Sequence, residues 1–244
     1  LVDIVEPTEA FTVSDWLAAA ESPIADIRSR GRIPIVVGGT HLYIKALLDG
    51  LFEGPDPDPA LRDSLRALGL PTLRAELERV DPAAAARIHP NDERRTIRAL
   101  EVFRQTGTPI SALQKQWEAN AGRPDCILIG LDWPSELLSP RINARVKAMM
   151  ERGLLEEART IAPRLGPQAS QALGYKQLLE HIRGRARLED AVEQIKIETR
   201  RFAKNQRTWL KRLRMTPGSA WIDAQKVPQK RWAAISHAAT LACL

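Results

Sequence analysis

The first part of the chain carries the hydrophobic pattern of an α/β unit. Residues 32–37 read Arg-Ile-Pro-Ile-Val-Val, an apolar run typical of a buried strand in a parallel sheet. Helices are predicted on both sides of this strand, over residues 15–27 with Thr12 or Ser14 as the cap, and over residues 41–48. This order of elements predicts half of an α/β unit.

The later part of the chain contains only two short predicted strands. Residues 126–131 read Cys-Ile-Leu-Ile-Gly-Leu and predict a second buried strand, and residues 220–223 predict an edge strand. From residue 140 onward the remaining pattern is helical almost to the end. The sequence therefore predicts an α/β protein with a mostly helical C-terminal part.

A proline-rich segment separates a helical insertion from this core. Residues 54–59 read Gly-Pro-Asp-Pro-Asp-Pro and predict a stiff, non-helical hinge. The pattern that follows is helical, with amphipathic helices over residues 61–68 and 73–80, and its place beside the hinge suggests a lid. The predicted divisions are a partial α/β core over residues 1–53, an inserted helical subdomain over 54–122, the remainder of the core over 123–223 and a tail helix over 224–244.

The longest predicted helix covers residues 195–214 and has two faces. Mostly apolar side chains, among them Ile195, Phe202 and Leu213, recur at helical spacing and predict a stripe buried against the protein. Glu198 is the only acidic residue in this segment, so almost no cation on the opposite face can be neutralised along the helix itself. The cations of that face are Lys196, Arg200, Lys204, Arg207, Lys211 and Arg214.

The charge of the whole chain agrees with this basic stripe. The formal net charge is +6 and the pI is near 9.6, with the excess of Lys and Arg concentrated in residues 174–214. An extended polyanion such as RNA or DNA is the expected partner, because each phosphate neutralised by Lys or Arg releases condensed counterions. A solvated surface helix without a partner is the alternative interpretation of any basic stripe.

Composition excludes several other classes of protein. Cys126 and Cys243 are the only cysteines, too few for a disulfide framework and without the spacing of metal ligands, so no metal site is predicted. No apolar run approaches the length that spans a bilayer. We therefore expect a cytoplasmic protein with no membrane partner. Because the chain begins with Leu1 inside an apparent strand, we also expect that a further segment preceded it.

The turn after the first predicted strand is a candidate binding site. Ligands of parallel sheets lie beyond the carboxyl ends of the strands. The backbone N–H groups of Gly38 and Gly39 and the hydroxyl of Thr40 therefore lie where an anion or a base would bind. A tight turn that only permits close packing explains the two glycines equally well.

Three arginines stand in the first two turns of the helix that follows residues 89–92. Cations at a helix N-terminus oppose the helix dipole, which costs stability unless the cations face an anion or acidic side chains. Arg94, Arg95 and Arg98 are therefore candidates for binding an anionic ligand. Pairing with the acidic neighbours Glu93 and Glu101 is the structural alternative.

Four segments of the chain, taken together, indicate a protein family. They are Val-Gly-Gly-Thr-His-Leu-Tyr-Ile-Lys-Ala-Leu-Leu (37–48), His-Pro-Asn-Asp-Glu-Arg-Arg-Thr-Ile-Arg-Ala-Leu-Glu-Val (89–102), Ala-Leu-Gly-Tyr-Lys-Gln (172–177) and Thr-Arg-Arg-Phe-Ala-Lys-Asn-Gln-Arg-Thr-Trp-Leu (199–210). In this order and spacing they resemble the tRNA dimethylallyltransferase family. The match covers nearly the whole chain, from Leu1 to about Asp223.

The resemblance implies an activity and a fold. Enzymes of this family transfer a dimethylallyl group from its diphosphate to N6 of the adenosine 3′ of the anticodon in tRNA. The implied fold is a P-loop-NTPase-like parallel sheet core, here truncated at the N-terminus, with an inserted helical subdomain. The implied partners are the tRNA anticodon stem-loop and dimethylallyl diphosphate, with Mg²⁺ as the cofactor, and we expect a monomer.

The resemblance also implies a role for each matching residue. Thr40 would be the catalytic residue beside the target adenosine, and Tyr175 and Lys176 would contact the diphosphate. These roles are chemically reasonable, because cations stabilise the charge that develops on a leaving diphosphate and a base must leave its stack before its amine can attack. The residues implied in tRNA binding are Arg94, Arg95, Arg98, Gln171, Gly174, Lys196, Thr199, Arg200, Arg201, Lys204 and Arg207.

One part of the family pattern is missing from the sequence. The family has a phosphate-binding loop followed by an Asp that takes the N6 proton, and no Gly-x-x-x-x-Gly-Lys-Ser/Thr occurs in the 244 residues. We therefore expect this chain to be an inactive or impaired fragment of the enzyme. The alternatives are a nucleotide kinase-like phosphotransferase, which would share the core and lid, and a non-catalytic tRNA-binding module.

Overall fold

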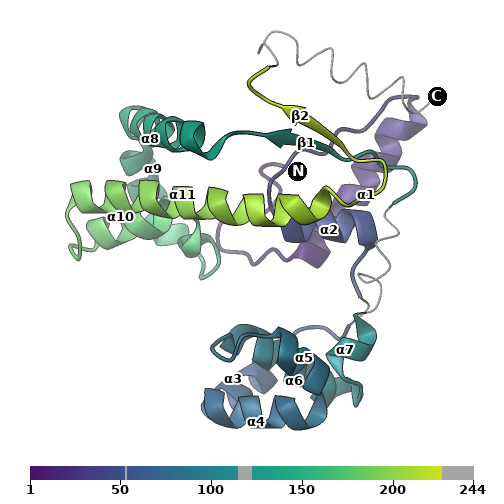
Figure 1. Cartoon of the computed structure of the whole chain (residues 1–244). Coiled ribbons are helices and arrows are strands. Elements are labelled where there is room, and N and C mark those ends of the chain that lie inside the picture. Colours follow the sequence, from purple (N-terminus) through teal and green to yellow (C-terminus); the bar gives the residue numbers. More distant parts are fainter. Residues whose placement is uncertain (53, 115–122, 227–244) are drawn as a thin grey trace. The chain divides into compact units, whose positions relative to one another are not determined.

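The computed structural model describes residues 1–52, 54–114 and 123–226 of the chain (Figure 1). This part is mostly helical and contains one two-stranded parallel sheet, so the predicted α/β class is confirmed. The chain divides into two compact units, of which one comprises Leu1–Leu47 and Gly122–Leu244 and the other Leu48–Ala121. The tail helix predicted within residues 224–244 falls almost entirely outside the described residues.

Two short strands form the sheet of the first unit. Strand β1 (Ile129–Asp132) pairs in parallel with β2 (Ala220–Asp223), and Asp132 lies opposite Asp223 in the register. Gly130 lies opposite Trp221, where a Cβ atom would collide with the indole ring. The edge strand predicted over residues 220–223 is therefore confirmed, and the strand predicted over residues 126–131 begins three residues later than expected.

The prediction of a strand over residues 32–37 is wrong. This segment has no regular secondary structure, and its apolar side chains are exposed, Ile35 to 68% and Val37 to 90%. The apparent strand at residues 1–5 is likewise irregular. An apolar run becomes a strand only when a neighbour completes its ladder of hydrogen bonds. No strand in the described part of the chain pairs with either segment.

Two helices on either side of residues 32–37 agree with the sequence pattern. Helix α1 (Val13–Ser29) begins at Thr12, whose backbone N–H donates to Asp15 Oδ2 at 2.7 Å while Asp15 N–H donates to Thr12 Oγ1 at 3.2 Å. This reciprocal capping identifies Thr12 rather than Ser14 as the cap. Helix α2 (His41–Asp49) follows the glycine turn as predicted.

Four helices form the larger part of the first unit. Their shared core includes Val146, Leu178 and Ile195, all nearly inaccessible to solvent. Helices α8 and α10 each pack against α11, and Figure 1 shows them gathered around its first half. The helices are α8 (Ser135–Glu151), α9 (Leu154–Ile161), α10 (Tyr175–Ile182) and α11 (Leu188–Leu213), with the short 3-10 turns η2 (Ala162–Arg164) and η3 (Ala169–Gln171) between α9 and α10.

The second unit is entirely helical in its described residues. Its core includes Leu65, Leu73, Leu77 and Leu100, each fully buried. Amphipathic helices with apolar residues at this spacing bury one face together, which explains a stable cluster of short helices. The helices are α3 (Pro59–Ala67), α4 (Leu70–Val80), α5 (Pro82–Arg87), α6 (Glu93–Thr106) and α7 (Ile110–Leu113).

Aspartates cap three of these helices. Asp58, Asp81 and Asp92 accept hydrogen bonds from backbone N–H groups at the starts of α3, α5 and α6. Asp81 is 2% exposed and also accepts from the backbone and the hydroxyl of Ser111, at 2.9 and 2.6 Å. The capping carboxylate of α5 therefore also fixes the start of α7.

None of the described helices combines the length and apolar character that a membrane span needs.

Candidate nucleic-acid interface

Helix α11 carries most of the cations that the sequence analysis singled out. It spans 26 residues and is longer than the predicted segment, which began at residue 195. Ile195 and Leu213 are buried as expected, but Phe202 is 48% exposed. The predicted apolar stripe is therefore buried only near its ends. The hydroxyl of Thr199, a candidate for tRNA contact, donates to the Ile195 carbonyl at 2.6 Å, as threonines inside helices commonly do.

Part of the basic stripe is neutralised, contrary to expectation. Glu193, two residues before the predicted start, pairs with Lys196 at 3.1 Å and with Arg200 at 3.3 Å. Hydrogen bonds from these two cations hold the pKa of Glu193 below its ordinary value. Arg201 pairs with Glu198 at 2.7 Å. The sequence argument missed these pairs mainly because it counted acidic residues only from residue 195 onward.

Exposed cations remain on α11 despite these pairs. Lys204 and Lys211 are exposed, and neither side chain has a hydrogen bond or ion pair with the described residues. Exposed ion pairs such as Arg201–Glu198 contribute only about 0–1 kcal/mol, so a phosphate could displace the carboxylate at little cost. Arg207 instead donates to the hydroxyl of Ser135. The helix therefore presents a net positive surface that suits a polyanion.

The turn at residues 38–40 lies against the second half of α11. Gln206 Nε2 donates to the Gly39 carbonyl at 2.9 Å, and a Cβ atom on Gly39 would collide with the Gln206 side chain. His41 stacks on Trp209, with the ring centroids 4.0 Å apart. Close packing therefore explains why residue 39 is a glycine, which is the alternative that the sequence analysis gave for this turn. Thr40 is exposed and precedes α2, and its hydroxyl has no partner among the residues that the structure describes.

The start of α10 places the candidate diphosphate residues. Gly174 is buried with φ of 104°, a conformation that favours glycine, and its N–H donates to Gln177 Oε1 at 2.9 Å. The hydroxyl of Tyr175 donates to Glu157, and this bond, with burial and the charge of Glu157, raises the pKa of Tyr175 to about 12. The Tyr175 hydroxyl is therefore already engaged. Lys176 is exposed, and its ammonium has no partner within the described chain.

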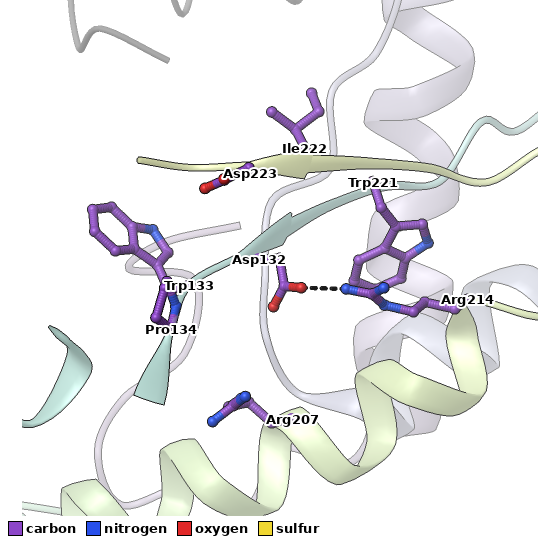
Figure 2. Close-up of a pocket in the computed structure, with 8 residues that line it drawn as sticks. All are labelled: Asp132, Trp133, Pro134, Arg207, Arg214, Trp221, Ile222 and Asp223. Carbon is purple, nitrogen blue, oxygen red and sulfur yellow. Dashed lines mark hydrogen bonds and ion pairs between the residues drawn. The ribbon is translucent and has the colours of Figure 1, made fainter. Parts of the chain in front are cut away.

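A pocket of about 360 Å³ lies at the carboxyl ends of β1 and β2 (Figure 2). Asp132 in its wall pairs with Arg214, whose guanidinium also lies 4.6 Å from the centroid of the Trp221 ring. Arg207 approaches the pocket from α11. Sequence reasoning did not single out Asp132 or Trp221, because the parallel pairing that brings their strands together joins residues 91 positions apart. Since Arg214 is paired within the pocket, we assign it a structural role.

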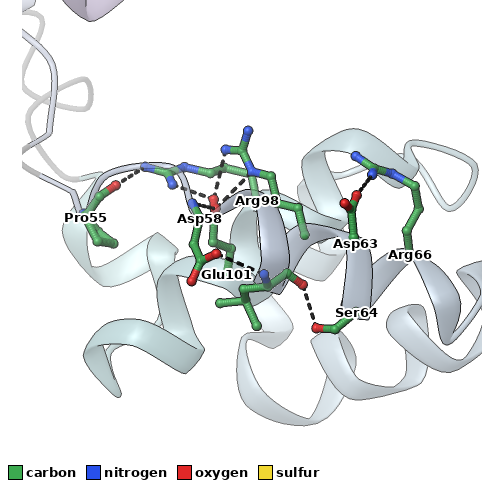
Figure 3. A network of polar contacts seen from close by, with 9 residues as sticks. Pro55, Asp58, Asp63, Ser64, Arg66, Arg98 and Glu101 are labelled. Atoms are coloured by element: carbon green, nitrogen blue, oxygen red, sulfur yellow. Dashed lines mark hydrogen bonds and ion pairs between the residues drawn. The ribbon is translucent and has the colours of Figure 1, made fainter.

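The arginines of α6 lie in the second unit and differ in their surroundings. Arg94 is exposed and has no ion pair with a described residue. Arg95 is also exposed and pairs with Asp92 at 3.3 Å. Arg98 donates to Glu101 at 2.5 Å and to the Pro55 carbonyl at 2.9 Å (Figure 3). For Arg98 the structure shows the ion pair that the sequence analysis left as an alternative.

Glu101 is the centre of this buried network. It is fully buried and accepts hydrogen bonds at 2.9 Å from Arg62 and at 2.8 Å from the Asp58 N–H, besides that from Arg98 (Figure 3). Burial opposes its ionisation more than any other single influence, but these hydrogen bonds together outweigh it and lower the pKa of Glu101. The network fixes the proline-rich segment against α3 and α6, so residues 55–58 do not form a free hinge within this unit.

Comparisons with known proteins identify the family. The model of the IPP transferase family matches residues 1–213. The chain belongs to the IPP transferase family. A tRNA dimethylallyltransferase of Syntrophobacter fumaroxidans is 45% identical over 231 residues, which cover 92% of this chain and 67% of that protein. One of Anaeromyxobacter dehalogenans is 46% identical over 235 residues, covering 94% of this chain and 77% of the relative.

Solved structures of IPP transferases share the fold. The full-length tRNA isopentenylpyrophosphate transferase of Bacillus halodurans is 35% identical with a TM-score of 0.65, and the match covers 100% of this chain and 77% of that chain. A eukaryotic dimethylallyltransferase acting on tRNA is 28% identical with a TM-score of 0.76, covering 96% of this chain and 62% of the other. The resemblance to the tRNA dimethylallyltransferase family is therefore confirmed.

Prenyl-diphosphate transferases such as this family generally use a divalent metal. Residues 1–52, 54–114 and 123–226 contain no group of three or more His, Cys, Asp or Glu side chains that could hold a metal ion. Mg²⁺ is commonly bound by one or two carboxylates together with substrate phosphates, so the protein need not supply a complete site. The described residues do not form one by themselves, and the expectation of Mg²⁺ stays a prediction.

Proposed function

We propose that this protein transfers the dimethylallyl group of dimethylallyl diphosphate to N6 of the adenosine 3′ of the anticodon in tRNA. The observation that carries the proposal is the 45% identity with a tRNA dimethylallyltransferase over 92% of the chain. Because this identity extends over both units, it relates each unit of this chain to the enzyme, beyond a likeness of fold alone.

The proposed reaction forms a bond between N6 and C1 of the dimethylallyl group. The bond between C1 and the diphosphate oxygen breaks, diphosphate leaves and N6 loses a proton. Lys176, exposed and without a partner in the described chain, would stabilise the negative charge that develops on the leaving group. The exposed hydroxyl of Thr40 would contact the target adenosine. If Mg²⁺ binds, it would supply further positive charge to the diphosphate.

The proposed tRNA contacts follow the exposed cations of both units. On α11, Lys204 and Lys211 are exposed and without an ion pair in the described residues, while Lys196, Arg200 and Arg201 can exchange exposed carboxylates for phosphates. On α6, Arg94 is the corresponding exposed cation. These contacts grip the backbone and position the RNA, and they do not read its sequence.

Label transfer tests the proposed function. The complete product of the gene is incubated with unmodified tRNA and dimethylallyl diphosphate labelled in the prenyl group. The expected result is label at N6 of the adenosine 3′ of the anticodon, and none when that adenosine is replaced by guanosine, which lacks an exocyclic amine at the same position. Phosphate transfer between small nucleotides without tRNA would instead support a nucleotide kinase-like phosphotransferase.

A non-catalytic tRNA-binding module predicts a different outcome. Such a module would bind tRNA with a strong inverse dependence on salt but would transfer no label. A kinase of small nucleotides has little use for the cationic stripe from Lys196 to Arg214, which is about 27 Å long at about 1.5 Å per residue. Tight tRNA binding without label transfer would therefore contradict the proposed activity and favour the module.

A further inference from the structure

A pocket of about 610 Å³ lies among helices α8, α9 and α10, outside the sites discussed so far except for Tyr175. We call it the α8–α10 pocket. The side chains that determine its chemistry are Arg145, Met149, Arg152, Glu157, Leu173 and Tyr175.

The two arginines of the α8–α10 pocket can bind anions. Arg145 is exposed, and its guanidinium donates to no described residue. Arg152 is also exposed and uses only its Nε, which donates to the Ala148 carbonyl at 3.1 Å. Arg145 lies in α8, and Arg152 directly follows the last residue of this helix, Glu151. Their spacing of seven residues places both on one side of the helix, with their backbones about 10 Å apart along the axis. The long side chains can converge on two phosphates of one nucleic-acid strand.

The remaining wall of the pocket suits a flat, partly apolar group. Leu173 is 43% exposed, although burial of a leucine is favourable, and Met149 also lines the pocket. The ring of Tyr175 is held in place because its hydroxyl donates to Glu157. Among the described residues that line the pocket, Glu157 is the only acidic one. A fixed aromatic ring beside exposed apolar groups is a common platform on which nucleobases stack.

Helix α8 also packs against α11 within the same unit. Arg200 on α11 donates to Asn143 Oδ1 on α8 at 2.6 Å, which places Asn143 on the face of α8 that meets the basic helix. Arg145, two residues later, lies about 200° further around α8 and therefore projects from another face. The α8–α10 pocket is thus a cationic surface separate from that of α11, in the same unit.

We propose that the α8–α10 pocket binds one unpaired nucleotide of the tRNA, with its flanking phosphates on Arg145 and Arg152 and its base against Tyr175 and Leu173. The inference rests on the proposed function, which supplies the RNA. Glu157 is a positioning residue in this account, because it acts on the base only through the orientation of the Tyr175 ring.

Salt titrations of tRNA binding test the phosphate contacts. The chain and the double variant Arg145→Gln/Arg152→Gln are compared by filter binding with an unmodified anticodon stem-loop. We expect the variant to bind about 10- to 100-fold more weakly, with the slope of log K against log salt smaller by about 1.4, at about 0.7 for each phosphate of a single strand. Lys147→Gln is the matched control on the same helix, since this exposed lysine lies outside the pocket lining and pairs with Glu151 at 3.8 Å. It should change affinity less than about twofold.

Abasic substitutions test the base contact. Stem-loops with one abasic loop position at a time are bound to the chain and to Tyr175→Leu. One loop position should weaken binding to the chain about tenfold when it is abasic, and should have no further effect on the leucine variant. Tyr175→Phe keeps the ring but loses its bond to Glu157, so it should retain only part of the abasic effect. The Glu157→Gln variant should retain most of the base effect, because glutamine can still accept from the tyrosine.

The outcomes separate this inference from the proposed function. An unchanged salt slope in the arginine double variant would overturn the nucleotide pocket. Equal abasic effects in the chain and in Tyr175→Leu would overturn it as well. Salt-dependent tRNA binding by the unaltered chain would still support the proposed function. Failure of the unaltered chain to bind tRNA at all would overturn both.

Discussion

Replacing Glu101 by Gln is expected to lower the free energy of unfolding of the helical unit by about 3 kcal/mol. The fully buried carboxylate binds both Arg62 and Arg98, and the neutral amide would leave these two guanidiniums without a compensating charge. Their side chains are 33% and 28% exposed, so water offsets part of the loss but not all of it. The same substitution weakens the attachment of residues 55–58 to α3 and α6.

Hydrogen exchange of the α3 and α6 amides measures this effect in the unit itself. Asp63→Asn is the matched control, because its ion pair with Arg66 lies nearby in Figure 3 but both side chains are more than half exposed. The control should cost less than about 1 kcal/mol. Equal losses in the two variants would show that the buried network does not stabilise the unit.

The effect of Glu101→Gln should also depend on pH. Because the folded state lowers the pKa of Glu101, the ionised carboxylate contributes stability above its ordinary pKa of about 4.3. That contribution is lost as the pH falls through the lowered pKa of the folded state. The difference in stability between the chain and the variant should therefore be full at pH 6 and above and shrink on acidification.

Replacing Lys176 by Ala is expected to weaken binding of dimethylallyl diphosphate by about 10- to 100-fold, because a charge-assisted contact to the diphosphate is lost. The affinity for tRNA should change less than about threefold. Arg200→Ala should do the reverse, with tRNA affinity reduced about 5- to 10-fold and diphosphate affinity nearly unchanged. The tRNA effect is moderate because Arg200 must exchange its contacts with Glu193 and Asn143 for a phosphate.

Calorimetric titration with dimethylallyl diphosphate and filter binding with tRNA measure the two affinities in the complete product of the gene. Arg183→Ala is the control for Lys176, since Arg183 is an exposed cation at the far end of α10 that pairs with Glu180 at 3.5 Å. It should leave the diphosphate affinity unchanged. Similar losses in both assays for Lys176→Ala and Arg200→Ala would contradict a division of labour between α10 and α11.

Local patterns in the sequence predicted the helices well, because a helix forms its hydrogen bonds within one segment. The starts of α1 and α6 follow from Thr12 and Asp92, whose side chains cap the first turn. Residues 32–37 show the limit of such patterns. Their β-branched run predicts a strand, but a strand also needs a partner, and the run itself does not specify one.

The candidate site was predictable only in part. The spacing of Arg98 and Glu101 indicated a possible ion pair, but their burial with Arg62 depends on packing between α3 and α6. The hydrogen bond between Tyr175 and Glu157 joins residues 18 positions apart on two helices, and no local sequence pattern predicts it. Exposed residues such as Lys176 were found only through the resemblance, because a single lysine at the start of a helix has no distinguishing pattern.

The salt dependence of tRNA binding by the chain tests the central claim most directly, namely that the exposed cations of α11 bind the RNA backbone. The chain is compared with the double variant Lys204→Gln/Lys211→Gln, which removes two α11 cations that lack an ion pair with the described residues. We predict that affinity falls steeply with salt and that the slope of log K against log salt is smaller by about 1.4 to 1.8 in the variant. An identical slope in the two proteins would contradict the account.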